Sequence, residues 1–527
     1  MPTLNWIGKD KVANHHREVP FRTLERKYTF GDNTTDNKII HGDNLEALKA
    51  LLPEYEGRIK CIYIDPPYNT GNEGWVYNDN VNDPKIQKWL GQVVGKEADD
   101  LTRHDKWLCM MYPRLALLKE LLSDDGAIFI SIDDNEQANL KLICDEIFGA
   151  GNFVANMTRI AKSGGGHDSK HLAIEYDYIL FYAKNLSTFQ TNKMLVDTEN
   201  DKKYKYKDDS FKRRGKYYLR DLDYRGNYSI GLDYPIVLEN GKELYAGGKF
   251  GKPNTWRWSK EKFEWGKKNG FIVIDNQKEK VYIKQYQFVD NEDNIRERFI
   301  PYRALSTHLN SEGSNDITNI FKQKIFDFPK PLSLLDTILQ IATDKSSIIL
   351  DSFAGSGTTA HAVLNLNKAD GGNRKFILVE MEDYAETITA ERVRRVISGY
   401  GSSNNAVEGT GGGFAYYELG EPVFAGDNLN ENIGVQKLCE YIWYSETRTP
   451  YKNTRKNSYL LGYHDNTDYY FYYEPDRITT LSHDTLNIVE RTAEAYVIYA
   501  DRCTIDKEWL NNHHIVFKKI PRDIRRF

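Results

Sequence analysis

Ten residues decide the fold of this chain: Asp351-Ser352-Phe353-Ala354-Gly355-Ser356-Gly357-Thr358-Thr359-Ala360. An apolar run at 347–350 precedes them and a helical pattern at 358–367 follows, which predicts a tight turn from a strand into a helix. The glycines let the backbone approach a ligand closely, with N–H groups of the helix start pointing toward it. No lysine follows the second glycine, which excludes a phosphate-binding P-loop. Three interpretations remain: a turn without a ligand, a dinucleotide site with Glu380 on the ribose, or a site for another nucleoside-bearing cofactor.

Strand-like and helix-like stretches alternate on both sides of this turn. Strand patterns lie at 38–40, 59–64, 127–132 and 375–379, and helical patterns lie at 45–52, 112–122 and 333–343. Such alternation is typical of an α/β fold with a mostly parallel sheet and helices on both faces. The alternation stops near residue 186 and resumes near 318. We therefore predict five parts: an N-terminal extension (1–37), two core halves (38–185 and 318–400), an insertion between them (186–317), and a small α+β C-terminal domain (401–527).

Composition narrows the class of protein. A chain of 527 residues has room for about three domains with full hydrophobic cores. No apolar stretch approaches the length of a membrane span, and the first residues lack the basic and apolar regions of a secretory signal. Five scattered cysteines form no CxxC pair, which argues against a zinc ribbon and favours reduced thiols. We expect a cytoplasmic protein without a metal or a membrane contact.

Charge is distributed unevenly along the chain. Residues 201–300 hold 23 Lys and Arg against 16 Asp and Glu, a local balance of +7, whereas the whole chain carries −5. The same hundred residues hold 19 Tyr, Phe and Trp. A basic, aromatic-rich segment inside an acidic protein indicates nucleic-acid binding.

A second motif, Asp65-Pro66-Pro67-Tyr68-Asn69-Thr70-Gly71, ends the apolar strand pattern at 59–64. The two prolines fix the backbone and remove two N–H donors, which leaves carbonyl oxygens as acceptors. Asp65 and the carbonyl of Pro66 can accept the two hydrogens of a flat NH₂-bearing group, and Tyr68 can stack on its face. A rigid proline turn without a ligand is the other interpretation.

In this order and with this gap, the two motifs resemble those of the β-class amino-methylating DNA methyltransferases. The run to Gly71, together with His41-Gly42-Asp43-Asn44-Leu45, is similar to the modification subunits of type III restriction–modification systems. The resemblance covers residues 38–185 and 317–400. It implies a Rossmann-like methyltransferase sheet with circularly ordered motifs, S-adenosylmethionine as the cofactor, and target recognition by the insertion.

The resemblance also assigns residues. The catalytic ones are Asp65, Pro66, Pro67 and Tyr68. The cofactor-binding ones are Asp43, Lys330, Asp351, Phe353, Gly355, Ser356, Gly357 and Glu380, with Glu382 as an alternative to Glu380 on the ribose. Lys330 would suit the carboxylate of the cofactor. Two plainer interpretations stay open, a helix cap for Asp43 and a solvated charge for Lys330.

These assignments predict methyl transfer to N6 of a flipped-out adenine in double-stranded DNA, with cytosine N4 as the closest chemical alternative. A nicotinamide dehydrogenase and a DNA-binding module without activity are the rival classes. The phosphate-contacting cations are expected to be Lys212, Arg213, Arg214, Lys216, Arg220, Arg225 and Arg257. We expect a homodimer, with residues 401–527 serving dimer or partner contacts. We see no helicase P-loop and no nuclease motif, so DNA cleavage would need a separate restriction subunit.

Overall fold

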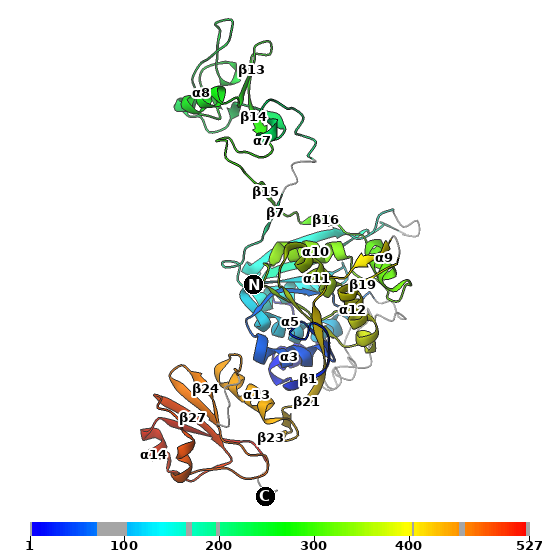
Figure 1. Cartoon of the computed structure of the whole chain (residues 1–527), viewed down its shortest axis with the longest axis vertical. Helices are drawn as coiled ribbons and strands as arrows, with labels where there is room; N and C mark the ends of the chain where they lie inside the picture. Colours follow the sequence, from blue (N-terminus) through cyan, green and yellow to red (C-terminus); the bar gives the residue numbers. More distant parts are fainter. Residues whose placement is uncertain are drawn as a thin grey trace. The chain divides into compact units, whose positions relative to one another are not determined.

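A computed structural model describes residues 3–70, 103–164, 171–195, 201–402, 405–452 and 459–522. Gly71, at the end of the second motif, lies outside these ranges. The chain forms two compact units, residues 1–192 with 303–527 and residues 193–302, and Figure 1 shows the elements of each. Within the described ranges, no helix is long and apolar enough to cross a membrane.

The first unit is built on a ten-stranded sheet, which confirms the expected α/β fold. Its order is β1 (Arg22–Gly31), β21 (Gly413–Pro422), β2 (Lys38–His41), β18 (Lys375–Glu380), β17 (Ile348–Asp351), β3 (Ile59–Ile64), β4 (Leu122–Ile132), β6 (Tyr176–Ala183), β5 (Phe153–Ile160) and β16 (Leu305–Thr307). All neighbours from β21 to β4 run parallel, whereas β1 and β6 are antiparallel to the strands beside them.

Helices on both faces bury the central strands. Chain connections from β2 through α3 (Asn44–Tyr55) to β3, and from β3 through α5 (Arg103–Leu121) to β4, advance across the sheet in one direction. The connection from β17 through α11 (Thr358–Asp370) to β18 runs in the opposite direction. Because such crossovers are right-handed, α11 covers the face opposite to α3 and α5. The helices α10 (Leu332–Ala342) and α12 (Glu391–Ser398) pack against α11.

Strands from the two halves of the chain interleave at the centre of the sheet. β17, from the second half, pairs with β3 from the first half, with Ile349 opposite Cys61. β18 pairs with β2, also from the first half, with Val379 opposite Ile40. Neither half can therefore complete the sheet without the other.

The structure moves the predicted boundaries. The insertion is shorter than expected: β16 and α9 (Asn310–Phe321) belong to the first unit, so the second unit spans 193–302 rather than 186–317. At the other boundaries, β1 lies in the predicted extension 1–37 and β21 in the predicted domain 401–527. Both strands pair within the large sheet.

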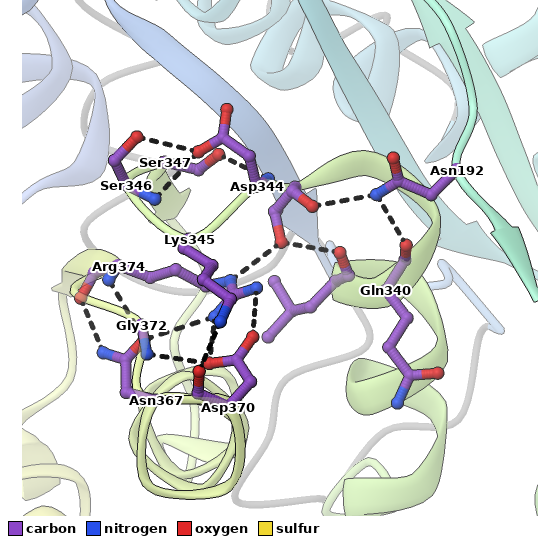
Figure 2. A network of polar contacts seen from close by, with 12 residues as sticks. Asn192, Gln340, Asp344, Lys345, Ser346, Ser347, Asn367, Asp370, Gly372 and Arg374 are labelled. Carbon is purple, nitrogen blue, oxygen red and sulfur yellow. Dashed lines mark hydrogen bonds and ion pairs between the residues drawn. The ribbon is translucent and has the colours of Figure 1, made fainter. Parts of the chain in front are cut away.

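A polar network anchors the point where the chain leaves the first unit. The side chain of Asn192 donates to the carbonyls of Gln340 and Thr343, both at 2.9 Å, at the end of α10. Nearby, Arg374 pairs with Asp370 at 2.9 Å, as Figure 2 shows. The last residue before the second unit is thus tied to the core helix layer.

The second unit has a core of its own. β8 (Tyr217–Asp221), β14 (Lys280–Tyr286) and β13 (Ile272–Asp275) form an antiparallel sheet beside α8 (Lys260–Lys268), while β9 (Asp223–Arg225) pairs with β12 (Asn254–Trp256). Many of its aromatic residues are buried in this core, including Tyr234, Trp256, Trp258, Phe263, Phe271 and Tyr286. The aromatic enrichment seen in the sequence therefore serves the packing of this small unit to a large extent.

The C-terminal part forms a smaller sheet within the first unit. β24 (Leu460–His464) is antiparallel to β25 (Thr467–Phe471), and β25, β27 (Ala495–Ala500) and β29 (Ile515–Lys519) run parallel. The helix α13 (Val435–Thr447) packs on this sheet through a cluster that includes Leu438, Trp443 and Phe471.

Candidate active site

Both sequence motifs meet at one edge of the large sheet. Parallel strands β3 and β17 end at Ile64 and Asp351, and their chain connections lead away in opposite directions. Such a switch point leaves a crevice at the carboxyl ends of the strands. Here it is a cavity of about 560 Å³.

One set of predicted residues lines this cavity: Asp65, Pro66, Tyr68, Lys330, Asp351, Phe353, Gly355 and Ser356. Another set does not belong to its lining: Asp43, Pro67, Gly357 and Glu380. The two sequence motifs, 286 residues apart in the chain between Asp65 and Asp351, thus face one common space.

Residues from other parts of the chain hold the loop that carries Asp65 and Tyr68. The indole N–H of Trp107, on α5, donates to the carbonyl of Pro67 at 2.7 Å. Asn69, whose φ of 57° is positive, donates to the buried carboxylate of Glu136 and to the carbonyl of Arg103. The sequence gives no direct signal for Trp107, because an apolar residue in a helical pattern reads as core.

Tyr68 presents a neutral ring to the cavity. Its hydroxyl is buried and has no hydrogen-bond partner among the described residues. Burial raises the pKa of Tyr68 well above its ordinary value, with Asp177 and Asp65 adding to the effect. A neutral aromatic ring at this position is suited to stacking on a planar group.

Two acidic side chains, those of Asp351 and Glu380, accept hydrogen bonds that hold the glycine loop in place. Asp351 accepts from the N–H of Phe353 at 3.1 Å and from the hydroxyl of Thr359 at 2.5 Å. Glu380 accepts from the N–H of Gly355 at 2.7 Å and from that of Glu382 at 3.0 Å. Glu380 is only 4% exposed, so in this structure it supports the loop from behind.

Burial makes both acids poor at ionising. It raises the pKa of Asp351 to about 7 and that of Glu380 to about 7, against ordinary values of 3.8 and 4.5. Because these pKa values are higher in the folded state, the folded protein holds protons that the unfolded chain releases between about pH 4 and pH 7. The contribution of each acid to the free energy of unfolding therefore falls as the pH rises through this window.

Replacing Asp351 by asparagine, which cannot ionise, is expected to remove its share of this pH dependence. The stability of the variant relative to the wild type should rise by up to roughly 1.4 kcal/mol per pH unit between about pH 4 and pH 7. Urea unfolding of both proteins at several pH values in this range measures the difference. A constant difference across the range would contradict the assigned pKa of Asp351.

A buried arginine, Arg392, contacts the glycine loop, and no sequence motif predicts it. Arg392, on α12, is 0% exposed and donates to the hydroxyls of Ser356 at 2.9 Å and Thr358 at 2.7 Å. Burial lowers its pKa to about 10, so it stays charged at neutral pH. In the sequence, Arg392 falls in the run Arg392-Val393-Arg394-Arg395, which would be taken for a solvated helix face.

Two of the predicted cofactor ligands have other partners. Asp43 caps α3, since its carboxylate accepts from the N–H groups of Leu45 at 2.9 Å and Glu46 at 3.1 Å. This is the plainer interpretation that the sequence left open. The ammonium of Lys330 lies 2.5 Å from Oδ2 of Asp65, so it contacts the Asp65–Tyr68 motif instead of standing in solvent.

The predicted phosphate contacts in the second unit divide into exposed and buried residues. Lys212, Arg220 and Arg225 are exposed, and Lys216 and Arg257 are partly exposed. Arg213 is exposed but paired with Asp293 at 2.7 Å. Arg214 is 8% exposed, paired with the same Asp293 at 2.9 Å and stacked over Phe271. The expectation that Arg214 contacts phosphate is therefore corrected, because its charge is used inside the unit.

The residues that the structure describes offer no cluster of metal ligands at the cavity. Within the ranges that the structure describes, no group of three or more His, Cys, Asp and Glu side chains could hold a metal ion. The lining of the cavity brings Asp65, Pro66 and Tyr68 together with residues of the glycine loop. This arrangement can hold two organic groups next to each other.

The family model for DNA methylases, N6_N4_Mtase, matches residues 59–391, from the first residue of β3 to the first of α12. This stretch includes both motifs and more than half of the chain. The chain belongs to this family of DNA methylases.

Three relatives illustrate how far the likeness of this methylase extends. It is 34% identical to the type III restriction-modification enzyme EcoPI Mod subunit of Escherichia phage P1, over 72% of this chain and 64% of the relative. It is 33% identical to the StyLTI Mod subunit of Salmonella typhimurium, over 80% of this chain and 66% of the relative. It is 34% identical to the type II methyltransferase M.KpnI of Klebsiella pneumoniae, over 66% of this chain and 81% of the relative. The methylase thus spans somewhat less than two thirds of the length of the two Mod subunits.

Proposed function

We propose that this methylase transfers a methyl group from S-adenosylmethionine to N6 of an adenine flipped out of double-stranded DNA. The single observation that carries the proposal is the common cavity of Asp65, Tyr68 and the glycine loop. Methyl transfer from a bound donor to a weak nitrogen nucleophile is chiefly a problem of holding the two reactants in line. A cavity with one motif on each side suits that task.

The residues present fit the proposed cofactor. Gly355 and Gly357 have φ values of 51° and 79°, which place loop backbone where a side chain would be strained. Asp351, Phe353 and Ser356 line the same cavity. When bound there, S-adenosylmethionine supplies an activated methyl group on its sulfonium. The chain supplies the loop that holds it and, through Arg392, the charge that fixes the hydroxyls of Ser356 and Thr358.

On the other wall, Asp65 and the Pro66 carbonyl would accept the two amino hydrogens of the target base. Accepting both hydrogens makes the nitrogen more electron-rich, because its lone pair is drawn less into the ring. Tyr68 would stack on the flipped base and replace part of its lost stacking, worth roughly 1–3 kcal/mol. Cytosine N4 offers the same NH₂ group. The aspartate before the two prolines favours adenine by the family resemblance.

The second unit would recognise the DNA sequence. Four of its lysines, Lys242, Lys262, Lys278 and Lys284, are ion-paired within the unit. Around the β9–β12 pair, Arg225, Lys249 and Lys252 are exposed, together with Tyr224 and Phe250. We name Arg225, Lys249, Lys252 and Arg257 the basic ledge, and propose that it contacts DNA phosphates.

The basic ledge has a fixed scaffold. Asp223 accepts from the N–H of Gly247 at 3.0 Å and from the side chain of Asn254 at 2.9 Å. The guanidinium of Arg257 lies 4.6 Å from the ring centre of Tyr224. Segments held by these contacts can present cations and aromatic rings at fixed positions relative to one another.

We further propose that the protein is the modification and specificity subunit of a type III-like system. The similarity to the EcoPI and StyLTI Mod subunits supports this assignment. We include in the same proposal a restriction subunit as a partner, a homodimer and a cytoplasmic location. The similarity to M.KpnI supports the second candidate, a methyltransferase that acts without a restriction subunit.

Sequencing that maps modified bases in DNA from cells expressing the protein tests this proposal. The expected result is N6-methyladenine at one recurring sequence, absent from cells that carry the empty vector. Methylation at cytosine N4 would replace adenine by cytosine as the substrate. Unmodified DNA, with the protein folded and supplied with S-adenosylmethionine, would overturn the proposal.

Valine in place of Gly357 is expected to weaken the binding of S-adenosylmethionine. Gly357 has φ of 79°, and an added Cβ would lie 3.2 Å from the carbonyl oxygen of Thr389, so both strain and contact oppose the change. Gly355→Val, at φ 51°, should behave alike. Isothermal titration calorimetry measures the affinity, and Gly371→Val, an exposed positive-φ glycine with open space around it, is the matched control. Unchanged affinity in both loop variants would refute the role of the loop.

A further inference from the structure

The contact between Lys330 and Asp65 is the feature of the cavity that the family motifs do not explain. The ammonium of Lys330 binds Oδ2 of Asp65 at 2.5 Å, and their side chains are 12% and 20% exposed. The same ammonium lies 4.9 Å from the ring centre of Tyr68. The other carboxylate oxygen, Oδ1, is buried and has no hydrogen-bond partner among the described residues. One oxygen of the acid is thus occupied, and the other is left without a donor.

The backbone of Lys330 is held on two sides. An added Cβ on Gly313, in α9, would lie 2.1 Å from the carbonyl oxygen of Pro329, so α9 approaches this segment as closely as only glycine permits. The hydroxyl of Thr358 donates to the carbonyl of Lys330 at 3.2 Å. Prolines flank the lysine at 329 and 331 and restrict its backbone. These contacts fix the backbone of the 329–331 segment and so determine where the side chain of Lys330 lies. One of them comes from Thr358, the first residue of α11.

We infer that Lys330 is a positioning residue for Asp65, which it holds by Oδ2 so that Oδ1 is presented to the amino group of the target base. The inference rests on the proposed function and deepens it. A charge-assisted hydrogen bond to one carboxylate oxygen fixes the rotation of the whole group. An acid fixed in this way meets the base without first having to reorient, which is how positioning lowers a barrier.

The rival role for Lys330 is a contact with the carboxylate of S-adenosylmethionine, as the resemblance suggests. The two roles make different demands. A cofactor ligand affects the affinity for S-adenosylmethionine, whereas a positioning residue for Asp65 affects the rate once both substrates are bound. The geometry favours the second role, because the ammonium already has a carboxylate partner within the catalytic motif.

The test compares Lys330→Met, Lys330→Arg and a matched control, Lys368→Met. Lys368 is a half-exposed lysine on α11 that pairs with Glu408 at 2.9 Å, away from the cavity lining. Methyl transfer is measured at saturating S-adenosylmethionine and saturating cognate DNA. Binding of S-adenosylmethionine is measured separately by isothermal titration calorimetry, and thermal melting reports on the fold.

For Lys330→Met we expect kcat to fall by about a hundredfold, with the Kd for S-adenosylmethionine changed by less than about twofold. Lys330→Arg should restore part of kcat, because it keeps a cation within reach of Oδ2. Lys368→Met should match the wild type. Should Lys330→Met melt at a markedly lower temperature, Lys330→Gln, which keeps a polar end, replaces it.

A Lys330→Met protein that keeps the wild-type kcat at saturation overturns the inference, whatever its Kd for S-adenosylmethionine. So does a loss of kcat that arginine does not restore at all. The proposed function fails separately, since in that case the wild-type protein itself would not methylate DNA.

Discussion

Methyl transfer by the Asp65→Asn variant is expected to fall by at least about 10²–10³-fold, while S-adenosylmethionine still binds. Asp65 is the only carboxylate of the motif at 65–71, and it follows β3 and lines the cavity together with the glycine loop. Lys330 should hold the one amide oxygen of asparagine, so that an NH₂ group replaces Oδ1, the acceptor for the target amine, while the glycine loop stays unchanged. Asparagine is preferable to alanine here because it keeps the volume of the side chain beside Lys330.

The measurement is the transfer of tritiated methyl groups to cognate DNA, with calorimetric binding of S-adenosylmethionine in parallel. Asp125→Asn is the control: Asp125 is an exposed aspartate that pairs with a lysine, Lys60, at 2.7 Å, near the opposite ends of β3 and β4. Asp65→Ala should lose transfer as well. Wild-type rates in either Asp65 variant would remove Asp65 from the reaction.

Exchange of residues 193–302 for the matching segment of a relative with another recognition sequence is expected to move methylation to the relative's sequence. The segment forms a compact unit with its own hydrophobic core, so it can be replaced without opening the large sheet. Loss of one base contact costs only roughly 1–3 kcal/mol, whereas exchange of the whole reading unit redirects the enzyme. Mapping of methylated adenines in cells that express the chimera gives the answer.

The boundaries of that exchange matter. Replacing 186–317 instead would also exchange β16, which pairs with β5, and residues 310–317 of α9, where Gly313 contacts the Pro329 segment. We expect that wider chimera to lose activity. An active 193–302 chimera that keeps the original recognition sequence would show that specificity lies outside this unit.

Much of the sheet could be predicted from the sequence because its central strands are short apolar runs. Ile59–Ile64, Ile348–Asp351 and Lys375–Glu380 are almost completely buried, and such strands show continuous hydrophobicity. β1 escaped prediction because Arg22–Gly31 is rich in charged and polar residues and only one of its residues is fully buried. The predicted insertion, 186–317, includes the start of α9, because the sequence Asn-Ser-Glu-Gly-Ser-Asn there has no apolar face.

The sequence predicts the parts of the site that lie within short local motifs. The order Asp-Pro-Pro-Tyr and the glycine loop each reflect one turn of backbone, so one stretch of sequence is enough to identify them. Contacts between distant segments leave no such trace. Arg392 reaches Ser356 from 36 positions along the chain, and Lys330 reaches Asp65 from 265 positions away. Side chains of this kind are recognised only when the fold brings them together.

The interleaving of β17 and β18 between β2 and β3 has a consequence during synthesis on the ribosome. When residues up to 302 have emerged, the second unit can already fold, whereas β2 and β3 still lack the two strands that belong between them. Unpaired edges of this kind invite pairing with other chains. These edges find their partner strands only once residue 380 has emerged, so the nascent chain passes through a stage that is prone to pairing with other chains.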